Sequence, residues 1–195
     1  MTKRMYHLIV YLLLCVSCSS CSSTHSKSDL IISKNKEILQ KSYKIALLPF
    51  KNKYIRPRSS VGEFDVPVNA GEIVAQYVEK ELLRTEKFKI IDREHLSKIL
   101  EEQKVSLSGI TENVADVGKL LNADGIIVGE VIELNTLKQA VNLNGTCVFI
   151  MKLIDVKSGE VIFTFNAEEK VPFGSYLDAL SNAVVKFRQE IESKL

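Results

Sequence analysis

The sequence predicts an α/β fold of the α+β type, a single three-layer domain in which a mixed β-sheet of about five strands is flanked by helices. Two observations lead to this prediction. From residue 43 onward, apolar runs of strand length alternate with segments whose apolar residues recur at helical spacing. Residues 126–131 (IIVGEV) are an almost unbroken apolar run, as expected for a central strand covered on both faces.

Residues 88–131 contain the strand–helix–helix–strand unit around which the prediction is built. A short β-prone run (FKII) ends at Asp92, whose carboxylate can accept the free N–H groups of a following helix. The helical pattern breaks at residues 106–109 and restarts at Thr111. The second helix should end near residue 123, just before the central strand.

Three more strands are expected outside this unit. Residues 43–50 (YKIALLPF) predict the first strand, which ends near Pro49 because proline cannot donate to a β-ladder. Residues 146–156 and 160–170 predict two strands joined by a Lys-Ser-Gly hairpin turn. The apolar residues of the hairpin are assigned mostly to the core: Val148, Phe149, Ile150, Leu153, Val161, Ile162, Phe163 and Phe165.

Two further helices have recognisable start signals. Asn69 and Glu72 are spaced as a capping box for a helix over residues 70–86. Ser175 and Asp178 have the same spacing at the start of the last helix. The last helix carries one apolar stripe along its length: Leu177, Leu180, Val184, Phe187 and Ile191.

The N-terminal segment has the organisation of a secretion signal. Lys3 and Arg4 precede an apolar run over residues 8–14, so residues 1–17 are predicted to be a lipoprotein signal peptide. A membrane-spanning helix needs about 20 apolar residues, and this run is much shorter.

Three cysteines crowd the end of this signal. Small residues before Cys18 resemble a bacterial lipobox, so Cys18 is the predicted lipidated residue, with Cys21 as the alternative. A multiply acylated, palmitate-bearing cysteine would hold the protein on a membrane without a spanning segment. Residues 18–41 are predicted to be the lipidated N-terminus and tether, with an arm of some helical character over residues 29–41, and residues 42–195 to be the folded domain.

The charge of the mature chain excludes one class of partner. Removing the signal leaves 24 basic and 24 acidic side chains. A chain without net charge is not a general nucleic-acid binder.

Three motifs together resemble one family. They are IIDREHLSKILEEQ, VGKLLNADGIIVGEV and LIDVKSGEVI, within a match that covers roughly residues 43–170 in order. The chain resembles CsgG, the curli secretion lipoprotein family of the bacterial envelope, and the related LpoB and TolB N-terminal-type domains. The resemblance implies a compact periplasmic α/β domain, lipid-anchored at the outer membrane, that acts in curli-like assembly or envelope biogenesis by binding other envelope proteins or its own copies.

The resemblance also raises the question of a pore. Family channels insert transmembrane hairpins between sheet strands, and each spanning strand needs about 9–11 residues. Residues 135–144 are too few for two crossings, and residues 171–174 are fewer still. We therefore expect the pore-forming hairpins to be absent.

The residues between the first strand and the first helix, 51–68, form a long predicted loop that is rich in basic side chains. Lys51, Lys53, Arg56 and Arg58 are either a solvated cluster or a surface that contacts acidic groups or a neighbouring subunit. Glu130 interrupts the central strand, where it can face solvent on an uncovered part of the sheet, pair with a buried base, or contact another subunit.

No constellation of catalytic or metal-binding residues is evident. His95 has carboxylates nearby in sequence, but adjacent helical positions point apart, and Cys147 is expected to be a small buried side chain. The sequence therefore predicts no enzyme, no cofactor, no metal and no small-molecule substrate. An enzyme acting on cell-wall or lipid substrates would need a nucleophile with a base, or paired carboxylates.

Two roles remain open for a binding protein of this kind. One is a subunit of an oligomeric outer-membrane secretion complex, and the other is an LpoB-like regulator of a peptidoglycan synthase.

Overall fold

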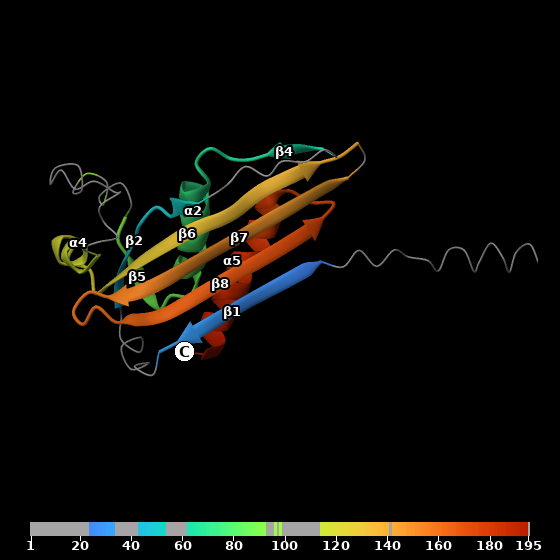
Figure 1. The fold of residues 1–195 in the computed structure, drawn as a ribbon. Helices are drawn as coiled ribbons and strands as arrows, with labels where there is room; N and C mark the ends of the chain where they lie inside the picture. Colours follow the sequence, from blue (N-terminus) through green and yellow to red (C-terminus); the bar gives the residue numbers. More distant parts are fainter. Residues whose placement is uncertain are drawn as a thin grey trace, which may run out of the picture.

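The structure, a computed structural model, describes residues 24–33, 43–53, 62–92, 96, 98, 114–140 and 142–194. Its strands form one open sheet: β1 (His25–Ile32), β2 (Tyr43–Leu47), β3 (Lys51–Asn52), β4 (Glu63–Asp65), β5 (Phe88–Ile90), β6 (Gly125–Lys138), β7 (Leu143–Asp155) and β8 (Val161–Pro172). The order is β1-β8-β7-β6-β2-β5, with β3 and β4 also paired to β6 (Figure 1). Parallel pairs at β2 combine with antiparallel pairs at β6, β7 and β8, so the sheet is mixed, as predicted.

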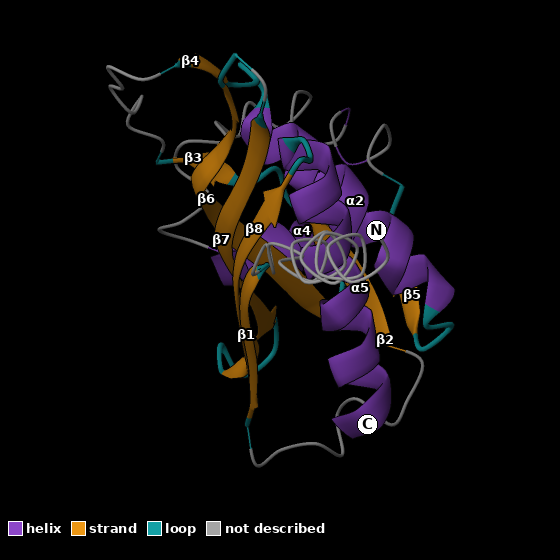
Figure 2. Cartoon of the chain, turned by 90° about the vertical axis from the view of Figure 1, so that its right-hand side faces the viewer, coloured by secondary structure: helices purple, strands orange, loops and turns teal. Residues whose placement is uncertain are grey.

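Helices α2 (Ala70–Arg84) and α5 (Tyr176–Lys194) pack on one face of this sheet, and Figure 2 shows them on the same side. The larger core cluster lies between them and the strands. Helix α4 (Val114–Leu120) contributes to a separate, smaller cluster on the other face, with Val117 packed near Ala46, Ile126 and Val156. The fold is therefore three-layered near β2 and the start of β6, and the predicted α+β class is confirmed.

The three longest strands extend further than predicted. Residues 135–138, expected in a connection, continue β6 and pair with β7 as far as Lys138 opposite Leu143. Leu134, Asn135 and Thr136 are all buried, so their backbone groups need the partners that the ladder to β7 provides. The expected loop over residues 51–68 likewise contains β3 and β4, both of which pair with β6.

The structure contains a strand, β1, where the sequence analysis expected the start of an arm with some helical character. Residues 25–32 pair antiparallel with β8, from His25 opposite Lys170 to Ile32 opposite Phe163. Leu30 is buried in the larger core while Ile31 is exposed, which is the two-residue period of a strand. The sequence did not predict this strand because its start is Ser-rich and only two of its apolar side chains point toward the core.

The two predicted helix starts had different outcomes. At α5 the capping box is confirmed, because the N–H and hydroxyl of Ser175 donate to Asp178 Oδ2 over 2.7 and 2.8 Å, and the Asp178 N–H donates back to Ser175 Oγ. At α2 the predicted cap is wrong: the Asn69 side chain makes no capping hydrogen bond. Its backbone carbonyl accepts the N–H of Glu72 instead.

Asp92 lies at the end of the described part of its segment. Its backbone carbonyl accepts the N–H of Leu96, which is helical and buried in the smaller core. Most of the helix expected after Asp92 lies outside the described residues. The predicted start of the second helix, at Thr111, lies outside them as well.

The outer edge of the sheet at β1 is closed by side chains of α5. Glu190 Oε2 accepts the Leu30 N–H over 3.0 Å, and Lys194 Nζ donates to the Leu30 carbonyl over 2.6 Å. Ser28 Oγ donates to the other Glu190 oxygen over 2.7 Å. Unpaired backbone groups on an edge strand can pair with another chain. These contacts satisfy the backbone groups of Leu30 and so protect the edge at this position.

At the opposite end of the sheet, Tyr43 ties β2 to β7. Its hydroxyl lies 2.5 Å from Asp155 Oδ2 and 2.8 Å from the Asp124 carbonyl oxygen. The N–H and hydroxyl of Ser158 also donate to Asp155. Burial alone would raise the pKa of Asp155, but these hydrogen bonds outweigh it and hold the pKa below its usual value.

Candidate interaction surface

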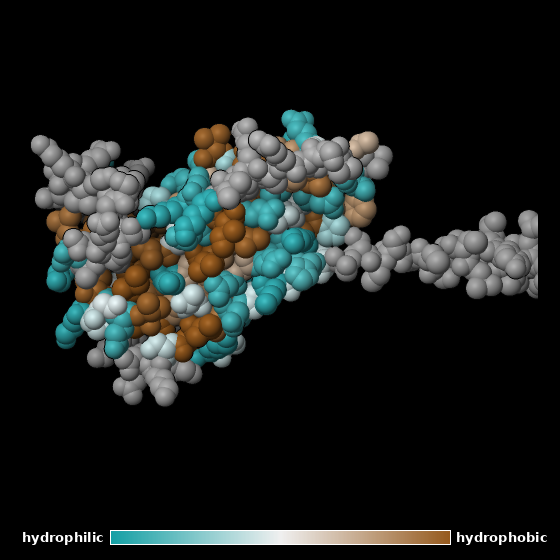
Figure 3. All heavy atoms as spheres, in the orientation of Figure 1, coloured by the Kyte–Doolittle hydropathy of each residue, from teal (hydrophilic) through white to brown (hydrophobic). Residues whose placement is uncertain are grey.

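The part of the sheet that no helix covers is the clearest surface feature among the described residues. It is formed by side chains of β3, β6, β7, β8 and β1 that point away from α2 and α5, and Figure 3 shows apolar atoms gathered over it. We call it the open face and define it by these residues: Lys27, Asp29, Ile31, Lys51, Lys53, Val128, Glu130, Ile132, Val148, Ile150, Lys152, Val161 and Glu168.

The apolar side chains of the open face follow from the strand period. Phe149 and Met151 are fully buried beneath α5 and its neighbours, so Val148 and Ile150 between them must face the other way. Ile132 is the extra residue of a β-bulge in β6 and is 43% exposed. Since no described helix lies over this part of the sheet, these apolar residues remain partly in contact with water.

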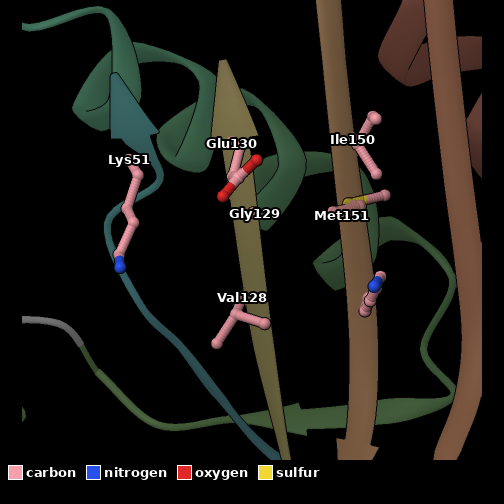
Figure 4. Close-up of a pocket in the computed structure, with 7 residues that line it drawn as sticks. Lys51, Val128, Gly129, Glu130, Ile150 and Met151 are labelled. Carbon is pink, nitrogen blue, oxygen red and sulfur yellow. The ribbon is translucent and has the colours of Figure 1, made fainter. Parts of the chain in front are cut away.

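One shallow hollow of about 220 Å³ lies between β3, β6 and β7. Figure 4 shows Lys51 on β3, Val128 and Glu130 on β6, and Ile150 on β7 around it. Its floor is therefore apolar, and charged side chains stand at its rim.

A second hollow, of about 270 Å³, lies beside the first across Ile150 and extends toward β1. Ile132 and Val148 contribute apolar surface to it, and Lys27, Asp29 and Glu168 contribute charge. The two hollows share Ile150 and together extend over five strands, β3, β6, β7, β8 and β1, and we call them the groove.

The sequence explains why Lys51 of β3 and Lys53, directly after this strand, both lie on this face. Asn52 points inward, where its Oδ1 accepts the Gly71 N–H over 2.8 Å at the start of α2. Lys51 and Lys53, one residue to either side, must then point outward. Lys51 is opposite Glu130 in the register, and Lys53 Nζ lies 2.7 Å from Glu130 Oε2.

Glu130 therefore faces an uncovered part of the sheet, as the first of its predicted alternatives stated. Its side chain is 37% exposed and its partner Lys53 is 64% exposed, so the partner is not a buried base. An ion pair in this setting contributes little to stability, typically about 0–1 kcal/mol. Its position at the rim of the groove suits recognition better than folding.

Of the predicted site residues, the structure brings together Lys51, Lys53 and Glu130. Arg56 and Arg58 lie outside the described residues, and so do the two candidate lipidation sites, Cys18 and Cys21.

The residues that sequence reasoning missed are the apolar ones. Val148, Ile150 and Val161 were assigned to the core, but Val161 is 42% exposed and the other two are half-buried on the open face. The sequence did contain a sign of this exposure. A strand that is apolar at every position needs cover on both faces, and the sequence predicts too few helices to cover both faces of the sheet.

The described residues do not form a metal site: no group of three or more histidine, cysteine, aspartate or glutamate side chains among them could hold an ion. Cys147 is fully buried in the larger core, as expected, and burial raises the pKa of its thiol well above the usual value. A thiol kept protonated in this way is a poor nucleophile. His95 lies outside the described residues.

The helices in the described part of the chain include none long and apolar enough to cross a membrane.

Fold and surface together define the class: an α+β domain with one open mixed sheet, helices along the whole of one face, and an uncovered apolar groove on the other. Residues 26–142 match the family model of the curli production assembly/transport component CsgG. The chain therefore belongs to the CsgG family, as its motifs predicted. No curated protein matched the chain.

Two solved structures, PelC and GNA1162, support the same fold. A PelC dodecamer from Paraburkholderia phytofirmans aligns with a TM-score of 0.57 at 14% identity, covering 83% of this chain and 94% of that one. The lipoprotein GNA1162 from Neisseria meningitidis aligns with a TM-score of 0.56 at 14% identity, covering 77% and 99%. The C-terminal domain of LpoB from Salmonella enterica also aligns, with a TM-score of 0.44 at 12% identity, covering 68% and 83%.

Proposed function

We propose that this protein is a lipid-anchored, non-enzymatic assembly module on the periplasmic face of the bacterial outer membrane, which binds through its open face. The observation that carries the proposal is the apolar groove with a charged rim on the uncovered side of a CsgG-family domain. An apolar surface rimmed by polar groups is typical of protein interaction sites. Lipidation at Cys18, or alternatively at Cys21, supplies the anchor.

The preferred occupant of the open face is a second copy of this chain. Membership of the CsgG family and the likeness to a protein that crystallises as a dodecamer support assembly. The first hollow carries Lys51, Lys152 and Glu130 and the second carries Lys27, Asp29 and Glu168, so one is basic on balance and the other is acidic on balance. A surface with basic and acidic sides can pair head to tail with its own copy.

The proposed module lacks the pore-forming hairpins. Four residues of the sequence, 139–142, separate β6 from β7, and three, 173–175, separate β8 from α5. Each connection is far shorter than a pair of spanning strands requires. Purified protein in liposomes should therefore conduct no ions above the level of empty liposomes.

Site-specific photocrosslinking in intact cells tests the proposed surface. A photoreactive amino acid at Ile132 samples the groove, and the same residue at Leu83, which is 56% exposed on α2, is the matched control. We expect Ile132 alone to give crosslinked products, with mass spectrometry identifying this chain on both sides of the link. A peptidoglycan synthase as the captured protein would instead favour the regulator, and equal crosslinking at both positions would contradict a binding role for the open face.

Mass spectrometry of the mature protein tests the anchor separately. We expect a lipid on Cys18 or on Cys21 as the first residue. A mature chain with both cysteines unmodified would contradict the membrane address.

A further inference from the structure

One end of the domain gathers the start of β1, the β6–β7 connection and the β8–α5 connection. His25 at the start of β1 pairs with Lys170 near the end of β8. Asn144 at the start of β7 pairs with Pro172. Figure 1 shows the same three places together at one end of the sheet, and we call this the tether end.

Three large apolar side chains are exposed at the tether end. Phe173 follows the last residue of β8 and is 70% exposed. Leu143 at the start of β7 is 44% exposed, and Leu177 in the first turn of α5 is 39% exposed. Because Asn144 pairs with Pro172, Leu143 and Phe173 lie at the same end of adjacent strands, and Leu177 lies four residues after Phe173; we call these three side chains the apolar patch.

The backbone at Phe173 adds a second observation. Its φ is +58°, in the left-handed region that bulky side chains rarely adopt. Such a conformation costs free energy, and at a solvent-exposed turn glycine or asparagine would adopt it more readily. Packing within the domain does not offset this cost, because the ring is 70% exposed.

Two lysines around the patch are paired with carboxylates, whereas Asp178 keeps its negative charge. Lys138 Nζ lies 3.0 Å from Asp65 Oδ2, and Lys170 Nζ lies 3.2 Å from Glu168 Oε1. The Asp178 carboxylate accepts two hydrogen bonds from Ser175. Paired groups of this kind do not oppose the approach of an apolar or zwitterionic surface.

The length of chain before β1 limits how far this end can lie from an anchor. Cys21 precedes Thr24 by three residues and Cys18 by six. At about 3.5 Å per extended residue, a lipidated cysteine would hold the tether end within roughly 10–20 Å of the membrane surface.

We propose that the tether end lies against the lipid bilayer, with Phe173, Leu143 and Leu177 in the interfacial region. This inference rests on the lipid anchor of the proposed function and adds a second, non-covalent contact to it. Aromatic side chains are favoured at the level of the lipid headgroups. The open face runs along the strands from this end, so docking in this way leaves its groove free for other proteins.

The chain contains no tryptophan, so a single introduced one reports its own surroundings. The test uses full-length lipidated Phe173→Trp in vesicles of phosphatidylethanolamine and phosphatidylglycerol, with and without brominated acyl chains as quenchers. Leu83→Trp is the matched control, since Leu83 is similarly exposed on the last turn of α2, close to β5 and the opposite end of the sheet. Leu143→Trp is a second reporter within the patch.

We expect brominated lipids to quench the emission of Phe173→Trp and Leu143→Trp, since aromatic side chains are favoured at the interface, and to leave that of Leu83→Trp unchanged. Co-flotation of each variant with vesicles is measured in the same samples. Co-flotation with equal quenching at all three positions, or with none, would overturn the bilayer contact and leave the anchor intact. Failure of every variant to co-float would overturn both the anchor and this inference.

Discussion

The two faces of the sheet are made by the same strands, but they are covered differently. Under α2 and α5, four buried rings follow one another in the order Phe149, Phe165, Phe187 and Phe163, with neighbouring ring centroids 5.0–5.9 Å apart. On the open face, Ile132 and Ile150 lie between charged side chains and partly contact water. The covered face therefore supplies stability, while the open face is free to change without loss of the fold.

The largest effect is expected at the centre of the covered face. Phe165 is fully buried, with its ring 5.9 Å from that of Phe149 and 5.0 Å from that of Phe187. Phe165→Ala should lower the free energy of unfolding by about 3–5 kcal/mol, because it removes buried apolar surface and leaves a cavity. Urea unfolding followed by circular dichroism measures the loss, and a loss below about 1 kcal/mol would show that this face is not the main core.

A smaller loss is expected where a buried charge joins the two helices of the covered face. Glu81 is 3% exposed, and its carboxylate lies 2.5 Å from Arg84 Nη1 and 3.0 Å from Arg188 Nε. Glu81→Ala should cost about 2–3 kcal/mol, less than for a fully buried pair because both arginines reach solvent. Urea unfolding of Glu130→Ala, on the open face, is the matched control and should show almost no loss.

A pH-dependent effect on stability is expected where Tyr43 of β2 donates a hydrogen bond to Asp155 of β7. Asp155 has a pKa below its usual value in the folded protein, so its ionised form stabilises the fold above the unfolded pKa of about 3.9. That stability is lost as the pH falls through the lower, folded pKa. Asp155→Asn should therefore cost about 1–2 kcal/mol at neutral pH and progressively less below about pH 4. Urea midpoints across this range give the comparison, and a constant difference would rule out the ionised carboxylate as the cause.

The smallest effect on stability is expected on the open face itself. Ile132→Ser should change the free energy of unfolding by no more than about 0.5 kcal/mol, since the side chain is already 43% exposed. The same variant should lose the complexes captured through this face, measured by crosslinking from Ile150. Loss of the fold together with binding would show that the two faces are not separable.

Predictions from the sequence alone were most accurate where a residue interacts with its near neighbours in the chain. The Ser175–Asp178 capping box was predictable because its partners are three residues apart. The outward position of Glu130 was predictable because a carboxylate in an apolar strand needs water or a base.

What the sequence could not show depends on distant contacts. Leu30 belongs to a strand only because β8 offers it a partner and α5 bonds its exposed backbone groups. Val148 and Ile150 look like core residues until the number of covering helices on each face is known. Asn69 has the right spacing for a cap, but its side chain is not oriented toward the free N–H groups.

Strand β1 has a mechanical consequence for an anchored protein. It starts at the tether end and runs away from it, and all eight of its residues are in register with β8. A force that pulls the N-terminus toward the membrane therefore acts along the strand, so its hydrogen bonds to β8 share the load and must rupture together. The hydrogen bonds between the Leu30 backbone and the side chains of Glu190 and Lys194 would resist the same pull. The outermost strand is therefore the element through which tension on the anchor reaches the rest of the molecule.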